Sequence, residues 1–206
     1  MSFEEHPRLS TNVSRETRER LVAYVAVLLR WNQTINLVSR NDEANIWERH
    51  IEDSLALVPH VPVNLSHAVD LGSGGGLPGI VLAIATGVRF HLVESDQRKS
   101  AFLREAIRLT NANATVHAER AEKIKLPLTP LITARALAPL PKLLSWATPL
   151  LLPMGICLFP KGRNVTEELT LASTQWHMKV QIIDSFGAST ILRISEIARV
   201  EHLSRL

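Results

Sequence analysis

Apolar and polar positions alternate with the period of an α-helix near the start of the chain. Ser14 stands where an N-cap is expected, and Glu16 falls in the first turn that would follow. Apolar side chains then recur every three or four residues up to Trp31, at Leu21, Val25, Leu28 and Leu29. The pattern predicts an amphipathic helix that docks on the rest of the protein by one face.

A second helical pattern follows the polar segment 32–38. Asn41 or Asp42 can cap it, and Pro59 and Pro62 end it. The apolar positions on its shared face are Trp47, Ile51, Leu55 and Val58. We therefore expect residues 1–62 to form a helical extension ahead of an α/β core of residues 63–206, in a position suited to substrate recognition.

Short apolar runs alternate with helical patterns after residue 62. Runs typical of strands end near Asp70 and then fall at 88–94, 115–118, 128–136, 155–159, 177–184 and 189–197. Helices are predicted after the glycine-rich segment, after Ser95 or Asp96, and over 140–152 and 165–173. Alternating strands and helices favour a parallel sheet, and only the last connection is short enough for an antiparallel hairpin. The predicted fold is α/β, with about seven mostly parallel strands and an antiparallel last strand.

Composition narrows the class of protein. The 206 residues fit one domain, 46% of them are hydrophobic, and no apolar run reaches the ~18 residues of a membrane helix. The N-terminal residues lack the pattern of an export signal, and the lone Cys157 lies in an apolar run where it fills the core. We expect a cytoplasmic protein with no membrane partner. The net charge of +3 and the many arginines permit a nucleic-acid partner without requiring one.

The candidate chemistry begins at a glycine ladder. Asp70 precedes Gly72, Gly74 and Gly76 at the expected end of a strand. Glycine at these positions allows positive φ and lets a ligand approach the backbone. A carboxylate there attracts the ammonium and sulfonium of S-adenosylmethionine and repels a pyrophosphate. Gly74, Gly76 and Gly79 also match G-x-G-x-x-G, the pattern of dinucleotide-binding loops, but the match is weak evidence for such a loop. The sign of the charge favours the methyl donor and leaves a nicotinamide dinucleotide as the alternative.

A second acid supports an adenosine cofactor. Glu94 closes the strand that follows the glycine ladder, one βαβ unit beyond Asp70. A carboxylate at this place can accept both ribose hydroxyls. Because dinucleotide enzymes place an acid similarly, Glu94 does not discriminate between the two cofactors.

Several motifs together resemble one family across most of the chain. They are Trp31-Asn-x-x-Ile-Asn-Leu37, Arg49-His-Ile-x-Asp-Ser-Leu55, Asp70-Leu-Gly-Ser-Gly-Gly-Gly-Leu-Pro-Gly79, Arg98-Lys-x-x-Phe-Leu103, Ala134-Arg-Ala136 and Lys161-Gly162. In order and spacing they resemble the ribosomal RNA small-subunit methyltransferase G family, also called glucose-inhibited division protein B. The resemblance is weakest after Gly162. The glycine ladder alone indicates only a methyltransferase, and the two N-terminal motifs narrow it to this family.

The resemblance implies a class I S-adenosylmethionine-dependent enzyme that methylates N7 of one guanine in bacterial 16S ribosomal RNA. By motif position it implies donor-site roles for Gly72, Leu77, Ala121, Glu122 and Arg135. Together with the residues argued from the glycine ladder and the second acid, which are Asp70, Gly74, Gly76 and Glu94, these make up the predicted donor site. The expected partner is 16S ribosomal RNA or the small ribosomal subunit. The protein is expected to act as a monomer, and no metal site is predicted. Glu94 stands where the family often shows Asp, and glutamate can still span two ribose hydroxyls.

Guanine N7 carries a free lone pair, so its methylation requires no general base. Alignment of nucleophile, methyl and leaving sulfur can then account for up to ~7–11 kcal/mol of the barrier.

Arg135 and Lys161 are the candidate catalytic residues, as contacts to the donor carboxylate or to RNA phosphate. Asn36, Arg49, His50 and Lys161 are the candidate substrate-binding residues. Each has a structural alternative: an ion pair for Arg135, a solvated loop for Lys161, packing for His50 and a turn cap for Asn36. Another acceptor, or a non-catalytic RNA-binding role, remains open.

Overall fold

The apolar runs after residue 62 assemble into one seven-stranded sheet with the order β3-β2-β1-β4-β5-β7-β6. The computed structural model describes residues 13–162, 164–184 and 190–200. Strands β1 to β5 are mutually parallel, and β7 runs antiparallel to both β5 and β6. The strands are β1 Ala68–Leu71, β2 Phe90–Val93, β3 Ala114–His117, β4 Thr129–Thr133, β5 Leu151–Lys161, β6 Trp176–Asp184 and β7 Thr190–Arg199. This confirms the predicted mixed sheet with an antiparallel last strand.

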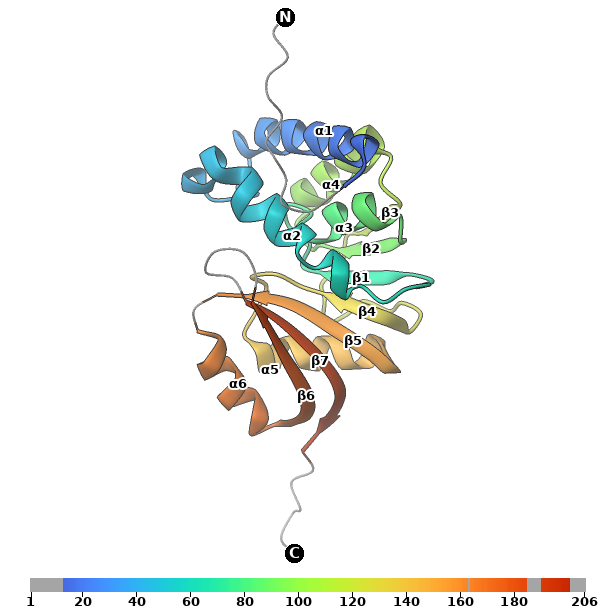
Figure 1. Ribbon diagram of the computed structural model, residues 1–206, viewed down its shortest axis with the longest axis vertical. Helices are drawn as coiled ribbons and strands as arrows, with labels where there is room; N and C mark the ends of the chain where they lie inside the picture. Colours follow the sequence, from blue (N-terminus) through green and yellow to red (C-terminus); the bar gives the residue numbers. More distant parts are fainter. Residues whose placement is uncertain (1–12, 163, 185–189, 201–206) are drawn as a thin grey trace, which may run out of the picture.

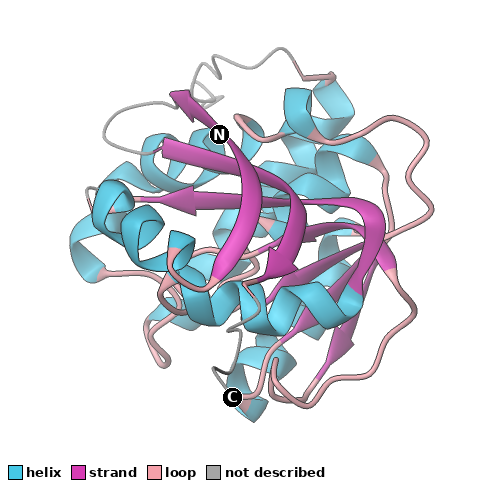
Figure 2. Ribbon diagram, turned by 90° about the horizontal axis from the view of Figure 1, so that it is seen from below, coloured by secondary structure: helices cyan, strands magenta, loops and turns pink. Residues whose placement is uncertain are grey.

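Helices cover the sheet on both sides (Figures 1 and 2). The α-helices are α1 Arg15–Asn32, α2 Asp53–Leu55, α3 Gly79–Thr86, α4 Gln97–Thr110, α5 Leu140–Ala147 and α6 Val165–Ser173. Shorter helical turns are η1 Arg40–Asn45, η2 Trp47–Glu52, η3 Val58–His60 and η4 Thr148–Leu150. In Figure 1 α1, α3 and α4 lie together at the top, whereas α5 and α6 lie beside the C-terminal strands. A mostly parallel sheet flanked by helices is the predicted α/β architecture.

Two hydrophobic cores form because neighbouring residues of a strand point to opposite faces. Ala68 belongs to the core under α1, α3 and α4, whereas Val69 belongs to the core under α5 and α6. Leu158 and Cys157 divide in the same way. Cys157 is fully buried, as predicted for a core filler, and burial raises the pKa of its thiol.

The first helix begins where the sequence predicts. The Ser14 side chain accepts a hydrogen bond from the Thr17 amide at 3.1 Å, and Leu21, Tyr24 and Leu28 on α1 are fully buried. Trp31 packs edge-on against Phe102 of α4 with ring centroids 6.0 Å apart, as expected of a packing residue. Residues 1–12 of the predicted helical extension lie outside the described part of the chain.

The second predicted helix differs from the prediction. Its cap is Ser39, whose hydroxyl accepts from the Asn41 amide at 3.2 Å, and neither Asn41 nor Asp42 caps it. A 3-10 turn, a π turn and a short α turn replace one continuous helix. Ile51 of the π turn and Leu55 of α2 are completely buried, and Glu52 and Ser54 between them are buried as well.

Three boundaries in the second half also differ. The fourth strand ends at Thr133, before the prediction of 136, because Ala136 takes a left-handed φ of 52° that no strand accommodates. The helix predicted over 140–152 ends at Ala147, followed by a 3-10 turn that contains Pro149. The fifth strand begins at Leu151, where it pairs with Thr129, and runs to Lys161.

In α4, Ala101 and Leu109 are exposed, and Leu103 is one of the residues that face the core.

Candidate functional site

The glycine loop, residues 72–78, joins the carboxyl end of β1 to α3. Gly72, Gly74 and Gly76 have φ values of 64°, 52° and 84°, which confirms the prediction that the backbone needs glycine there. Around the position where a Cβ of Gly74 would stand, the nearest atom is the Gly72 carbonyl oxygen at 3.7 Å. The loop therefore leaves open space beside Gly74, where a ligand can approach the backbone. Leu77 of the same loop is buried.

Glu94 holds this loop from the neighbouring strand. One carboxylate oxygen accepts from the Gly74 amide at 2.8 Å, and the other accepts from the Asp96 amide at 2.8 Å. Each carboxylate oxygen has a second lone pair for a ligand hydroxyl. Glu94 thus fixes the loop from the carboxyl end of β2, the position predicted for it.

Asp70 lies beneath the loop and is fully buried. Its Oδ1 accepts from the Thr133 hydroxyl at 2.6 Å, whereas its Oδ2 has no hydrogen-bond partner among the described residues. Burial raises the pKa of Asp70 to about 6, against the lowering effect of hydrogen bonds and of the nearby Arg135 guanidinium. An unpartnered buried carboxylate oxygen is an acceptor for a cationic or N–H-bearing group.

Ala121 and Glu122 lie in the connection that follows β3, beyond the carboxyl end of that strand. Ala121 is half-buried and Glu122 is exposed. Because β3 pairs with β2, the two residues lie at the sheet edge that also carries Glu94. The structure thus places every predicted donor-site residue at the carboxyl ends of β1 to β4.

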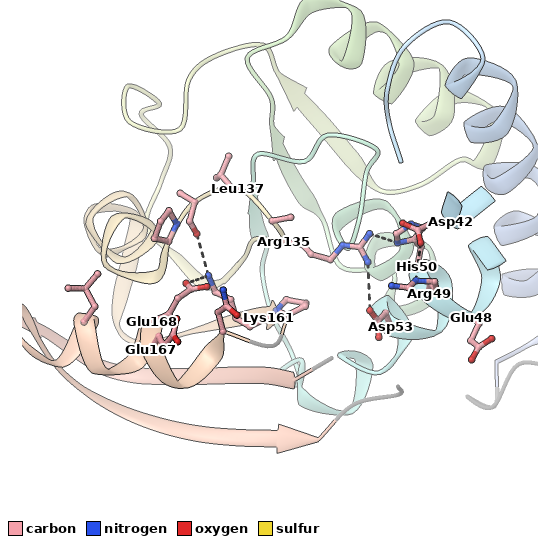
Figure 3. A pocket seen from close by; sticks show the side chains of 17 residues that line it. Asp42, Glu48, Arg49, His50, Asp53, Arg135, Leu137, Lys161, Glu167 and Glu168 are labelled. Carbon is pink, nitrogen blue, oxygen red and sulfur yellow. Dashed lines mark hydrogen bonds and ion pairs between the residues drawn. The ribbon is translucent and has the colours of Figure 1, made fainter. Parts of the chain in front are cut away.

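A large pocket, drawn in Figure 3, lies near the glycine loop: Leu137, which lines it, is the side chain that a Cβ on Gly72 would meet. Its volume is about 1080 Å³, and three segments line it: η1 to α2, the chain after β4, and the end of β5 with the start of α6. Arg49, His50, Arg135 and Lys161 all line this pocket, whereas Asn36 is exposed in the turn after α1 and does not. The structure therefore brings together all the predicted catalytic and substrate-binding residues except Asn36.

Arg135 occupies the centre of the pocket wall. Its Nη2 donates to Nδ1 of His50 at 2.5 Å, and its Nη1 lies 3.9 Å from Oδ2 of Asp53. Figure 3 shows these contacts as dashed lines that run from the arginine to two neighbouring turns of the helical extension. The chain after β4 is thereby tied to the extension.

His50 is held in its neutral form. Burial and the adjacent Arg135 guanidinium lower its pKa to about 4, although Asp42 acts in the opposite direction. Because Nδ1 accepts from Arg135, the proton of the neutral ring lies on Nε2, which faces Oδ2 of Asp42 at 3.8 Å. Asp42 also binds Nε of Arg49 at 3.0 Å.

Lys161 is a paired side chain of the pocket wall, which differs from the solvated lysine considered in the sequence. Its ammonium binds Oε2 of Glu168 at 2.6 Å and donates to the Ala138 carbonyl at 3.3 Å. Glu168 also accepts from the Leu140 amide at 2.7 Å, at the first residue of α5. Lys161 therefore joins β5 to α5 and α6.

Several residues of the site were absent from the predicted set. Asp42, Asp53 and Glu168 line the pocket, Thr133 binds Asp70, and the Tyr24 hydroxyl donates to the Gly75 carbonyl of the glycine loop. Glycine spacing pointed to the loop, but the sequence carries no local signal for partners 51 to 63 residues away along the chain. Tyr24 is the single tyrosine of the chain, which is a weak signal at best.

Carboxylates outnumber basic side chains in the lining of the pocket. Asp42, Glu48, Asp53, Glu167 and Glu168 line it against Arg49, Arg135 and Lys161, while His50 is neutral near pH 7. Five carboxylates against three cations give an excess of negative charge. Such a cavity favours a group that carries or acquires positive charge.

Comparison with known proteins places the chain among close relatives. The family model described as rRNA small subunit methyltransferase G matches residues 17–191. The chain is 55% identical over 192 residues to the Ribosomal RNA small subunit methyltransferase G of Granulibacter bethesdensis, covering 92% of this chain and 90% of that protein. It is 54% identical to the protein of the same name from Gluconobacter oxydans, covering 92% and 99%.

A solved structure of lower sequence identity shares the fold. The N-methyltransferase NodS from Bradyrhizobium japonicum, in complex with S-adenosylhomocysteine, superimposes with a TM-score of 0.56 at 14% identity. The match covers 84% of this chain and 97% of that one.

Within the described residues, no helix combines the length and apolar character needed to cross a bilayer.

Proposed function

The chain belongs to the rRNA small subunit methyltransferase G family, and on that premise we propose that it methylates N7 of one guanine in bacterial 16S ribosomal RNA. It is an S-adenosylmethionine-dependent methyltransferase. Membership of this family decides the choice that the glycine pattern left open, in favour of the methyl donor over a dinucleotide. Which atom of which nucleotide accepts the methyl group is the part that we propose.

The residues at the carboxyl ends of β1 and β2 fit the donor. Asp70 offers a buried carboxylate oxygen without a partner, and the Cβ position of Gly74, whose amide binds Glu94, meets no atom closer than the Gly72 carbonyl oxygen at 3.7 Å. We propose that the predicted donor set holds the cofactor, with Glu94 on the ribose hydroxyls and with Leu77, Ala121, Glu122 and Arg135 around it. When bound, the cofactor supplies an electrophilic methyl group on a sulfonium sulfur.

The observation that carries the choice of guanine N7 is the charge of the pocket. Methylation at N7 turns a neutral base into a cation, and the pocket next to the glycine loop has five carboxylates against three cations. Carboxylates that lie where positive charge develops stabilise the transition state more than the ground state.

The reaction requires no general base, and the pocket agrees with that requirement. His50 is neutral, but its Nδ1 lone pair already accepts a hydrogen bond from Arg135. Arg135 is buried among Asp53, His50 and Asp70, where it can orient the donor carboxylate or an RNA phosphate. We propose that catalysis rests on alignment and charge, with Arg135 as the residue that contacts both partners.

Arg49 and Lys161 are our proposed contacts to RNA phosphate. Two of the three N–H donors of Lys161 are used by Glu168 and Ala138, which leaves one at the pocket wall. Arg49 is exposed at the mouth of the same pocket. Asn36 lies in the turn after α1, and we propose that it contacts the RNA outside the pocket.

We further propose a single-domain monomer that acts in the cytoplasm, where ribosomal subunits are available.

The deciding experiment maps 7-methylguanine in 16S ribosomal RNA from a strain that lacks this protein and from its parent. We expect one modified guanine in the parent that is absent from the deletion strain and is restored by the purified protein with S-adenosylmethionine. Naked RNA and isolated small subunits should be tried side by side, because either can be the substrate. Identical modification in both strains would refute the proposed acceptor.

A methylated product on transfer RNA, on protein or on a small molecule would identify another acceptor for the same chemistry. Tight binding to the small subunit without any methyl transfer would indicate a non-catalytic role. Both outcomes are read from the same labelled-donor reaction.

A further inference from the structure

The glycine loop is held from two sides. On the sheet side, the Gly74 amide donates to Glu94. On the opposite side, the hydroxyl of Tyr24, a residue of α1 in the helical extension, donates to the Gly75 carbonyl. Tyr24 is fully buried, so this bond is shielded from water. The two contacts act on the peptide units 73–74 and 75–76 of the loop, with one unit between them.

Tyr24 fixes one particular peptide plane. The carbonyl of Gly75 and the amide of Gly76 belong to the same planar unit, and that amide donates to the Ser73 carbonyl at 2.6 Å. With the oxygen bound by Tyr24 and the nitrogen bound by Ser73, the plane cannot rotate without the loss of a bond. The φ of 84° at Gly76 depends on that orientation.

The turn after α1 supports the same segment of the loop. The side-chain oxygen of Asn32 accepts from the amides of Leu37 and Val38 at 2.8 and 3.0 Å, which fixes the turn. The Leu37 carbonyl oxygen then lies 3.2 Å from the position that a Cβ on Gly75 would take. The helical extension is thus packed directly against the middle of the loop.

Tyr24 is suited to hold a loop and not to transfer a proton. Burial raises the pKa of its hydroxyl far above the usual value, so the group remains a neutral donor. It also lies near Asp70 and Arg135, whose charges act on it. The hydroxyl therefore lies near two residues of the proposed donor site, Asp70 and Arg135, and binds the glycine loop at Gly75, without lining the pocket.

We propose that Tyr24 is a positioning residue for the donor site: its hydroxyl holds the Gly75–Gly76 peptide so that the loop has its ligand-binding shape before the donor arrives. A loop ordered in advance loses less conformational entropy on binding. Through Tyr24 the helical extension, whose later turns line the acceptor pocket, also sets donor affinity. This inference rests on the proposed function because it assumes that the loop receives S-adenosylmethionine.

The test compares Tyr24→Phe with Thr110→Val. Tyr24→Phe retains the buried ring and removes only the hydroxyl. Thr110→Val also removes one buried hydroxyl that donates to a backbone carbonyl, that of Ala106 at 2.7 Å, but at the end of α4, outside the loop and the pocket. Both variants lose a buried hydrogen bond, so both should unfold at a lower temperature than the wild type.

Only Tyr24→Phe should weaken binding of S-adenosylhomocysteine, measured by calorimetry, by roughly three- to tenfold, as expected for the loss of one neutral hydrogen bond. In steady-state methylation the KM for the donor should rise by a similar factor while the KM for the RNA substrate stays unchanged. Hydrogen exchange of the loop amides should become faster in the donor-free variant. A folded Tyr24→Phe protein with wild-type donor affinity would overturn the proposal.

A second variant keeps the test decisive if Tyr24→Phe does not fold. Gly75→Ala places a methyl group 3.2 Å from the Leu37 carbonyl and moves the loop away from the helical extension. It should weaken donor binding while the sheet stays folded, and unchanged affinity would again overturn the proposal. If the wild-type protein itself binds no S-adenosylhomocysteine, the proposed function fails. If the wild type binds and the variants bind equally well, only the role of Tyr24 fails.

Discussion

The glycine loop and the acceptor pocket lie side by side but are built in different ways. The loop is a backbone structure, fixed by glycines at positive φ and by hydrogen bonds from Glu94 and Tyr24. The pocket is a side-chain structure, in which Arg135 joins the chain after β4 to His50 and Asp53 of the distant helical extension. Ion pairs between residues closer in sequence, Asp42 with Arg49 and Lys161 with Glu168, complete it. A backbone cradle suits a cofactor that is the same in every turnover, whereas side-chain pairs can rearrange around an RNA. Changes in the two regions should therefore have different consequences.

The largest effect is expected when the loop is blocked. Gly74→Val fills the open space beside the loop and introduces a β-branched residue at a φ of 52°, so donor binding should fall below detection by calorimetry. Gly87→Val is the matched control, because Gly87 has a φ of 72° with no atom within 4 Å, at the end of α3. The control should lose stability and retain donor binding. Equal affinities in both variants would remove the loop from the donor site.

Loss of the carboxylate that holds the loop should have an intermediate effect. Glu94→Ala leaves the amides of Gly74 and Asp96 without their acceptors and removes the proposed ribose contact. We expect donor binding to weaken by roughly 1–3 kcal/mol, the range for hydrogen bonds to charged groups. Glu94→Asp should recover part of the loss if the second lone pairs reach the ribose. A titration indistinguishable from wild type would exclude this role.

Asp70 should show opposite effects on stability and on binding. Its pKa is about 6 in the folded protein against an ordinary value of 3.8, so the folded state binds the proton more tightly and the contribution of Asp70 to stability should fall as the pH rises from about 4 to about 6. Asp70→Asn removes this charge and should be more stable than wild type at pH 7 by roughly 1–3 kcal/mol. Donor affinity should fall in the same variant. Urea unfolding at several pH values and calorimetry measure the two effects, and a destabilised variant with full affinity contradicts both.

The smallest effect is expected from His50 in the pocket. Its pKa is lowered from 6.5 to about 4, so it is neutral in the folded protein where it would be protonated in the unfolded chain. The contribution of His50 to stability should therefore be fully present above pH 6.5 and decline as the pH falls toward 4, opposite in sign to that of Asp70. His50→Gln keeps a hydrogen-bond acceptor for Arg135 and should flatten that decline, with donor affinity near wild type. An unchanged pH dependence of the unfolding midpoint would show that protonation of His50 does not destabilise the fold.

The two regions also differ in how far the sequence predicts them. The loop, its flanking strand and helix, and the acid at the end of β2 follow from glycine spacing and apolar periodicity over 25 consecutive residues, from Asp70 to Glu94. The pattern failed at 3-10 and π turns and at boundaries next to proline, because those depend on backbone hydrogen bonds that periodicity does not encode.

The pocket shows the limit of the sequence more clearly. Motifs identified Arg49, His50, Arg135 and Lys161, but not that Arg135 donates to His50 or that Lys161 is paired with Glu168. Asn36 was chosen over Asn32, yet Asn32 is the buried asparagine that fixes the turn, and Asn36 is exposed. An amide side chain in a polar turn has the same local pattern whether it points inward or outward.

The sequence by itself determined the alternation of strands and helices, the glycine loop and the sign of charge beneath it, because these depend on neighbours within a few turns of chain. The tertiary structure alone decided which side chains share a cavity, that a tyrosine of the first helix binds the loop, and that Asp70 and His50 have displaced pKa values. Burial and the approach of charges from distant segments arise only when the chain has closed on itself. Burial and long-range charge interactions therefore cannot be read from the order of residues along the chain.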